Sequence, residues 1–338
     1  MDGRERVMNI FNKKKVDHNA FWLGIPHKDT KKIYSQYYNA KDDIDLNLKL
    51  GSDIYCAVAF SESWKHPEGR YFFDILPWEE RTSLSQEGVF AKYEDFSEIE
   101  NFTWPTIQYL DLSDSITNAK KARENGLAVL GGVWACFFHD MCELFGMENY
   151  FVNMYANPEF TLQVTERIME YYMEANRFCF ETMGDLIDIF YFGNDLGSQL
   201  DLLISPECFD KFILPYTVQI IKLAKQYGLP VMMHSCGSIS RIIPKLIEAG
   251  IDALHPIQAK AVGMNADSLS KYKNDLIFVG GVDTQELLPF GTTHQVRDEV
   301  KRLKSIFGDR LIISPSHETL LPNVGIENVI AMAQEAIA

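Results

Sequence analysis

The sequence lacks the features that mark membrane-spanning and secreted proteins. Its most apolar run, residues 127–138, is too short to cross a bilayer and contains glycines. The N-terminal residues Met1-Asp2-Gly3-Arg4-Glu5-Arg6 carry charges of both signs where a signal peptide has an apolar core. Six cysteines are scattered along 338 residues, without the dense spacing of a disulfide scaffold. We therefore expect a soluble, cytoplasmic protein with no membrane partner.

Positive charge and nucleotide-binding loops are also scarce. The formal net charge is −15, and Lys13-Lys14-Lys15 is a short basic run in a chain whose surface should repel phosphates. Glycine pairs are present, but no Gly-x-Gly-x-x-Gly or Walker-type loop occurs. These absences argue against a nucleic-acid partner and against a nucleotide cofactor. The hydrophobic content of 46% is that of a globular protein with a sizeable core.

The sequence does contain an alternation of short β-rich runs with longer helical patterns, which is typical of parallel α/β proteins. Eight runs are predicted as strands: 20–24, 54–60, 128–133, 187–192, 230–234, 253–256, 276–282 and 311–314. Eight parallel strands separated by helices favour a closed (β/α)8 barrel, the TIM barrel, over an open doubly wound sheet. No linker-like composition divides the chain, so we predict a single domain over residues 1–338.

Two helices have clear end signals. Ser205 followed by Pro206 predicts an N-cap with proline at the first helical position, and Gly228 predicts the end of that helical stretch. The apolar residues at 239, 242, 243, 246 and 247 follow helical spacing on one face. They predict a helix that opens at Ser238 and closes at Gly250.

A long departure from the alternation, residues 62–105, separates the second and third predicted strands. It is rich in aromatic residues and contains two strand-like pieces, 71–75 and 89–93, so it predicts an inserted hairpin or lid. Its aromatic residues could cover the barrel mouth or form a docking surface, and they could equally form a satellite core. The residues concerned are Trp64, His66, Tyr71, Phe72 and Phe73.

Polar residues follow several predicted strands at their carboxyl ends, where barrels of this kind carry their chemistry. They are Glu62 after the second strand, Asp195 and Gln199 after the fourth, His234 and Cys236 at the end of the fifth, Gln258 after the sixth, Asp283 and Gln285 after the seventh, and His317 after the eighth. Because parallel strands end on the same rim, we expect these side chains to share one face of the barrel.

His234 and Cys236 are separated by one residue at a strand end, so their side chains should point the same way. Nitrogen and sulfur donors suit Zn²⁺, and His317 could cross the barrel mouth to complete three protein ligands with an open fourth position. Glu318 or Asp283 could be an additional ligand or could fix an imidazole. The alternative is that the cysteine and His234 are ordinary core residues and that His317 caps the terminal helix.

Several motifs together resemble the uroporphyrinogen decarboxylase superfamily, and the resemblance covers nearly the whole chain. The motifs are Asn194-Asp195-Leu196-Gly197-Ser198-Gln199, Ile204-Ser205-Pro206-Glu207, His234-Ser235-Cys236-Gly237-Ser238, Gly250-Ile251-Asp252, Pro256-Ile257-Gln258, Gly280-Gly281-Val282-Asp283-Thr284-Gln285, Ser314-Pro315-Ser316-His317 and Glu327-Asn328-Val329. The resemblance implies a TIM barrel. It also implies one of two activities, a cofactor-free decarboxylase or a zinc methyltransferase that exchanges methyl groups with a corrinoid.

The sequence favours the methyltransferase branch. Uroporphyrinogen carries eight carboxylates, and the decarboxylases bind it with an arginine-rich N-terminal segment. The corresponding stretch here, 21–28, contains no arginine. The resemblance implies that a His-x-Cys pair and a later cysteine hold zinc in the methyltransferases. His234 and Cys236 match that pair, but this chain has His317 and Glu318 in the later position and no cysteine after Cys236.

The resemblance therefore implies a zinc-dependent methyltransferase or demethylase. It would exchange a methyl group between a small methylated substrate, or a thiol, and a corrinoid (cobalamin). No Asp-x-His-x-x-Gly corrinoid motif occurs, so a partner protein would carry that cofactor. The alternatives are a uroporphyrinogen decarboxylase-type enzyme and a non-catalytic barrel that binds a tetrapyrrole or another small ligand.

Individual roles follow from position on the rim. Asp195 and Asp283 are candidate catalytic residues, as proton donors or hydrogen-bond anchors, although an Asp after a strand also commonly caps the next helix. Glu62, Gln199, Gln258 and Gln285 are candidates for substrate binding. Glutamines in such loops also commonly bond the local backbone.

Overall fold

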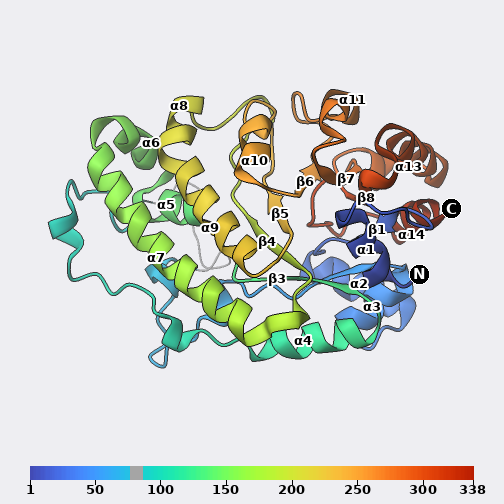
Figure 1. Ribbon diagram of the computed structural model, residues 1–338, viewed down its shortest axis with the longest axis horizontal. Helices are drawn as coiled ribbons and strands as arrows, with labels where there is room; N and C mark the ends of the chain where they lie inside the picture. Colours follow the sequence, from blue (N-terminus) through green and yellow to red (C-terminus); the bar gives the residue numbers. More distant parts are fainter. Residues whose placement is uncertain (77–86) are drawn as a thin grey trace.

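The computed structural model describes residues 1–76 and 87–338 and contains one eight-stranded parallel sheet (Figure 1). The strands are β1 Ala20–Phe21, β2 Ile54–Cys56, β3 Ala128–Gly131, β4 Ile189–Gly193, β5 Val231–His234, β6 Ala253–Ile257, β7 Ile277–Val282 and β8 Leu311–Pro315. Their order is β1-β8-β7-β6-β5-β4-β3-β2, and every pair in it is parallel. This confirms the (β/α)8 barrel and all eight predicted strands, mostly with shorter bounds.

Helices surround the barrel, and the two termini lie on the same side of the molecule (Figure 1). The helices are α1 Gly3–Phe11, α2 Lys28–Tyr38, α3 Asp43–Leu50, α4 Ser113–Glu124, α5 Phe137–Phe145, α6 Met147–Ala156, α7 Pro158–Met183, α8 Pro206–Cys208, α9 Leu214–Gln226, α10 Ile243–Ala249, α11 Ala266–Leu269, α12 Leu287–Phe290, α13 Thr293–Phe307 and α14 Ile326–Ile337. No described helix combines the length and apolarity that crossing a bilayer requires.

Short 3₁₀ and π turns join these elements. The 3₁₀ turns are η1 Ser61–Ser63, η2 Phe72–Asp74, η4 Phe96–Ile99, η5 Ile107–Tyr109, η6 Gly184–Leu186, η8 Ser270–Tyr272 and η9 Gly308–Arg310, and η7 Phe209–Ile213 is a π turn. η7 connects α8 directly to α9. Ser205 accepts a hydrogen bond from the Cys208 N–H, as an N-cap should, and Gly228 follows the end of α9 with a φ of 73°. Both predicted end signals of this helical stretch are confirmed.

The predicted helix 238–250 begins later than its apolar pattern indicated. α10 starts at Ile243 and ends at the left-handed Gly250. The Ser238 N–H donates to the Ser198 carbonyl, and the Ser238 hydroxyl donates to the Val262 carbonyl. These bonds to the loops after β4 and β6 hold the first residues out of the helix.

The barrel interior is filled by alternate residues of the strands, which explains how the site is positioned. Met232 of β5 and Ala253 of β6 belong to the inner cluster of buried side chains. Two residues further along, His234 and His255 continue on the same inward face, and they are register partners. The strand period therefore places two imidazoles side by side at the carboxyl end of the barrel interior.

The seam between β1 and β2 is closed by side chains as well as backbone. The Asp53 N–H donates to the Phe21 carbonyl at 2.7 Å, and the Phe21 N–H donates to the Asp53 carboxylate at 2.9 Å. Asp53 also pairs with Arg6 of α1, and both residues are buried. Through this ion pair, the N-terminal helix α1 is bound to the segment where β1 and β2 meet.

The insertion after β2 differs from its predicted local structure. Among its described residues, the two strand-like pieces are not strands: 71–75 contains the 3₁₀ turn η2, and 89–93 forms turns. Aromatic packing against α7 replaces strand pairing, because Phe72 and Phe73 both contact Tyr171 and Tyr172. Residues 77–86 of the predicted hairpin or lid lie outside the described residues.

Candidate metal centre

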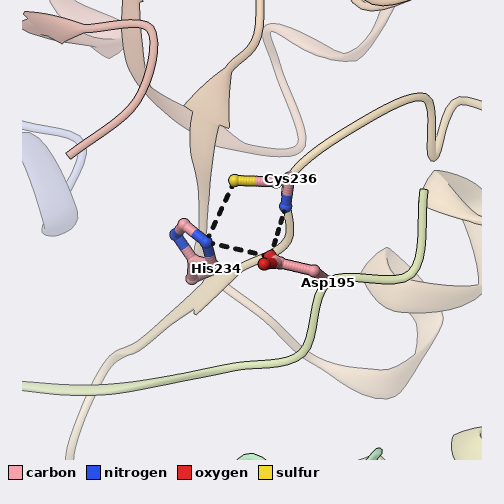
Figure 2. A group of neighbouring side chains, drawn as sticks. All are labelled: Asp195, His234 and Cys236. Atoms are coloured by element: carbon pink, nitrogen blue, oxygen red, sulfur yellow. Dashed lines mark hydrogen bonds and ion pairs between the residues drawn. The ribbon is translucent and has the colours of Figure 1, made fainter. Parts of the chain in front are cut away.

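His234, Cys236 and Asp195 converge at the carboxyl end of the barrel (Figure 2). His234 is the last residue of β5, and Cys236 lies two residues further along the chain. Asp195 comes from the loop after β4. The His234 Nε2 atom lies 3.3 Å from the Cys236 Sγ atom and 3.1 Å from the Asp195 Oδ1 atom. Asp195 also accepts the Cys236 backbone N–H at 2.9 Å. The carboxylate thus fixes both the imidazole and the chain that carries the thiol.

The loop after β8 brings His317 and Glu318 to the same place. Cys236, His317 and Glu318 each offer a ligand atom within 4.8 Å of the other two, as do His234, His255 and Glu318. The His317 Nδ1 atom accepts the Thr319 N–H at 3.0 Å, which turns the other ring nitrogen away from the local backbone. The predicted ligands His234, Cys236 and His317 thus lie in overlapping groups, which are joined through Cys236 and through Glu318, the residue predicted as a possible additional ligand.

His255 and Tyr191 lie behind His234, inside the barrel. The His234 Nδ1 atom is 2.9 Å from the His255 Nδ1 atom and 3.3 Å from the Tyr191 hydroxyl, which lies 3.0 Å from the same His255 atom. Neither residue was predicted from the sequence to belong to the site. The inward alternation of β4 and β6 was the signal that could have identified them.

The charges of the cluster reinforce one another. Burial by itself lowers the pKa of His234, but Glu318, Cys236 and Asp195 raise it well above its usual value. Burial raises the pKa of Asp195, and the opposing effect of His234 and His139 holds it well below its usual range. Burial, followed by the positive charge of His234, lowers the pKa of His255. The negative charges around His234 therefore stabilise a positive charge at its imidazole.

The donor set fits a resident zinc ion. The Glu318 Oε2 atom is buried and accepts no hydrogen bond from the described residues, although it lies 3.5 Å from His234 Nδ1 and 3.6 Å from His317 Nδ1. A buried carboxylate oxygen that accepts no hydrogen bond is costly unless a cation lies beside it, so its position beside a thiol and two imidazoles fits an ion-binding role. One thiol, two imidazoles and a carboxylate form a ligand set that zinc accepts.

The two candidate catalytic aspartates have different surroundings. Asp195 belongs to the cluster, whereas Asp283 accepts three backbone N–H groups, those of Gln285, Glu286 and Leu287. These bonds are what a helix cap makes at the start of α12, so the geometry favours the capping interpretation for Asp283. A proton-donor role for either aspartate stays a prediction.

The predicted substrate-binding residues are spread around the rim. Gln258 and Gln285 border a polar cavity of about 370 Å³ that His317 also lines. The Gln258 side-chain oxygen accepts the Gly237 N–H, so it also holds the loop that carries Cys236. Gln199 is exposed. Glu62 lies on the opposite side, at a second cavity.

That second cavity, which we call the aromatic cavity, has a volume of about 620 Å³ and lies between the insertion, the loop after β3 and α7. Its aromatic lining residues are Phe60, Trp64, Tyr71, Phe72, Trp134, Tyr171 and Tyr172. Trp134 is also a wall of the metal cluster, because its ring lies 5.9 Å from that of His234. Trp64, Tyr71 and Phe72 of the insertion therefore line a cavity beside the site, while Phe73 is buried in the core.

An acidic group missed by the sequence analysis lies in the aromatic cavity. Asp140 of α5 is buried and accepts the Tyr172 hydroxyl at 2.7 Å. Burial raises the pKa of Asp140 to about 7, against the opposing effect of the Tyr172 hydrogen bond. Its neighbour His139 reaches Asp195 at 3.5 Å. α5 therefore connects the aromatic cavity to the metal cluster.

Comparison with known proteins agrees with this architecture. The chain matches the uroporphyrinogen decarboxylase family over residues 82–337 and belongs to that family. A solved methyltransferase from Methanosarcina mazei superimposes with a TM-score of 0.71 at 17% identity, over 99% of this chain and 98% of that one, which shows a shared fold.

One curated relative is similar in sequence over a shorter stretch. A methylated-thiol–coenzyme M methyltransferase of Methanosarcina mazei is 30% identical over 99 residues, which are 29% of this chain and 25% of the relative. The matched stretch thus spans about a quarter of that relative's length.

Proposed function

We propose that this protein is a zinc-dependent methyltransferase. It would exchange a methyl group between a small methylated substrate, or a thiol, and a corrinoid carried by a partner protein. The observation that carries the proposal is that Cys236 and Glu318 lie together with His317 and that each of them also lies beside His234. Family membership and the similarity to a methylated-thiol methyltransferase support the same class of reaction.

Zinc would be held by His234, Cys236 and His317, with Glu318 as a further oxygen donor. When bound, it would supply a Lewis acid that makes a sulfur, oxygen or nitrogen atom a better leaving group or keeps a thiol deprotonated. Asp195 fixes the His234 ring and the Cys236 backbone. His255 and Tyr191 accept or share the proton at His234 Nδ1.

We infer that the methylated substrate occupies the aromatic cavity. Trp134 lines this cavity and its ring lies 5.9 Å from that of His234, so a substrate there would lie beside the metal cluster. Aromatic side chains from the insertion, from the loop after β3 and from α7 would exclude water from it. Asp140 holds a proton near neutral pH and could return it to the leaving heteroatom. Glu62 would contact the substrate from the exposed end.

The alternatives have less support from the site. A uroporphyrinogen decarboxylase needs several arginines for its carboxylate-rich substrate. Arg70 lines the aromatic cavity, but its guanidinium is already paired with Asp74. A non-catalytic barrel that binds a small ligand has no use for a thiol, two imidazoles and a buried carboxylate at one point.

The first test is metal content. The protein purified without added metal or chelator should contain about one zinc per chain, and a His234→Ala/Cys236→Ser double variant should contain less than about a tenth of that. Inductively coupled plasma mass spectrometry measures the metal, and far-UV circular dichroism checks that the variant is folded. A His294→Ala/Cys208→Ala variant changes the same residue types outside the site and should keep its zinc.

A folded wild-type protein that takes up no zinc even after dialysis against it would overturn the proposal. If zinc is present, methyl transfer is tested with free cob(I)alamin, whose methylation is followed by absorbance. Methylated thiols should be tried first, because of the similarity to the methylated-thiol enzyme, followed by methyl ethers and amines. No methylated cobalamin from any of them would remove the methyltransferase assignment while leaving the zinc site in place.

The support behind His234 gives a second test. If Nε2 binds the metal, Nδ1 carries the proton and donates it to His255 Nδ1, which holds the ring in place. His255→Leu should weaken zinc binding by about 10–100-fold, and Tyr191→Phe should have a smaller effect in the same direction. Competition with a chromophoric chelator measures the affinity. His255→Asn offers an acceptor near the Nδ1 position and should retain most of it. Equal affinities in the Leu and Asn variants would refute this role.

A further inference from the structure

A basic cavity lies at the end of the barrel opposite the metal centre. It has a volume of about 440 Å³, and Lys13, Lys14, Lys15, Lys273, Asp309 and Arg310 line it. These residues come from the three segments that lead into β1, β7 and β8. Because those segments precede their strands, the cavity is at the amino-terminal face, where barrel enzymes do not place their catalytic groups.

The charge of this cavity contrasts with that of the chain. Five cationic side chains line it in a protein whose formal net charge is −15, and Asp309 is the acidic residue among its lining. In the described part of the chain, none of the five has a carboxylate within ion-pair distance. Lys273 donates a hydrogen bond to the Ile306 carbonyl oxygen, and Arg310 donates one to that of Ile10. Asp252 and Asp275 act on Arg310 only at longer range.

Two residues of the cavity lining have locally unfavourable features. Lys13 has a φ of 56° and follows the end of α1, at a position where glycine is usual. Its N–H donates to the Ile10 carbonyl, and the Lys14 N–H donates to the Asn9 carbonyl. A lysine in this left-handed conformation is strained relative to glycine. The Arg310 Nε atom is buried and has no hydrogen-bond partner among the described residues.

We propose that the basic cavity binds a small oligophosphate anion, such as pyrophosphate or tripolyphosphate. Five cations match an anion with three to five negative charges, and a guanidinium with a free N–H favours phosphate oxygens. Among the described residues that line the cavity, Ile10 is the apolar one and none is an aromatic residue that could stack on a base. The cavity therefore fits the phosphate chain better than a nucleoside phosphate.

A structural role for the same lysines makes different predictions. Cations near the C-terminus of α1 interact favourably with the helix dipole, and this alone would explain why they are there. In that case the lysines contribute to stability and bind no ligand. Lys13→Gly separates the two roles, because it relieves the left-handed backbone and removes one charge from the cavity.

The test is isothermal titration calorimetry of the full chain with sodium tripolyphosphate at an ionic strength of about 20 mM, where charge interactions are least screened. Wild-type protein should bind one anion per chain. Lys14→Gln/Lys15→Gln and Arg310→Gln should each weaken binding by about 10-fold or more. A Lys120→Gln/Lys222→Gln variant removes two exposed lysines elsewhere and should bind as the wild type does. Lys13→Gly should raise thermal stability and still weaken binding.

Because tripolyphosphate chelates zinc, the titration is repeated in the His234→Ala/Cys236→Ser background, where the same affinity is expected. No saturable binding would overturn the proposal, and so would an equal loss of affinity in the control lysine variant. Binding that disappears in the His234→Ala/Cys236→Ser background would also overturn it, because the anion would then be bound at the metal centre.

Discussion

Replacing Gly237 with alanine is expected to lower the free energy of unfolding by about 3–4 kcal/mol and to abolish zinc binding. Gly237 follows Cys236 directly and has a φ of 81°, which an alanine adopts only with strain. A Cβ atom would lie 2.1 Å from the Gly197 carbonyl oxygen and 2.7 Å from that of Ser198. Both are backbone atoms of the loop after β4, so neither can rotate away, and overpacking adds to the strain.

The loss of zinc follows from the same geometry. The Gly197 loop also carries Asp195, which fixes His234 and Cys236, so separating the two loops moves the ligands apart. Urea denaturation measures stability, and metal analysis measures zinc. Gly228→Ala is a matched control, because Gly228 has a φ of 73° with nothing within 4 Å of the added Cβ atom. It should cost about 1 kcal/mol and keep its zinc. Equal effects of the two substitutions would contradict the clash.

Replacing Asp53 with alanine is expected to cost about 3–5 kcal/mol of stability without a direct effect on the metal cluster. Asp53 pairs with the buried Arg6 and accepts the Phe21 N–H across the β1–β2 seam. Removing the carboxylate leaves a cation and a backbone donor buried without this partner, and one-sided loss of a buried ion pair is strongly destabilising. Urea denaturation followed by tryptophan fluorescence measures the effect.

Two companion variants identify the cause. Asp53→Asn keeps an acceptor for Phe21 but loses the charge, so it should fall between the wild type and Asp53→Ala. Asp17 also pairs with Arg6 but is far more exposed, and Asp17→Asn should therefore cost less than about 1 kcal/mol. A loss below about 1 kcal/mol in Asp53→Ala would mean that Asp17 and the Met1 carbonyl are sufficient to satisfy Arg6.

Local patterns in the sequence were sufficient to predict much of the fold and part of the candidate site. The period of two along β5 placed His234 and Cys236 on one side, and the rule that parallel strands end on one rim brought His317 toward them. The insertion was harder to predict, because its aromatic residues have β propensity but pack against α7 instead of pairing as strands.

The sequence by itself determined the eight strands, the barrel and the rim of polar residues, because these depend on periodicity and on chain order. Only the tertiary structure decided which rim residues meet. Asp283 bonds to the start of α12, whereas Glu318 turns toward Cys236 and His317. His255 and Tyr191 support His234, and Lys13 and Arg310 share one cavity across about 300 residues of chain. These contacts form only when the barrel closes and brings segments together that are far apart in the sequence. Local sequence patterns do not specify the distances between side chains of such segments.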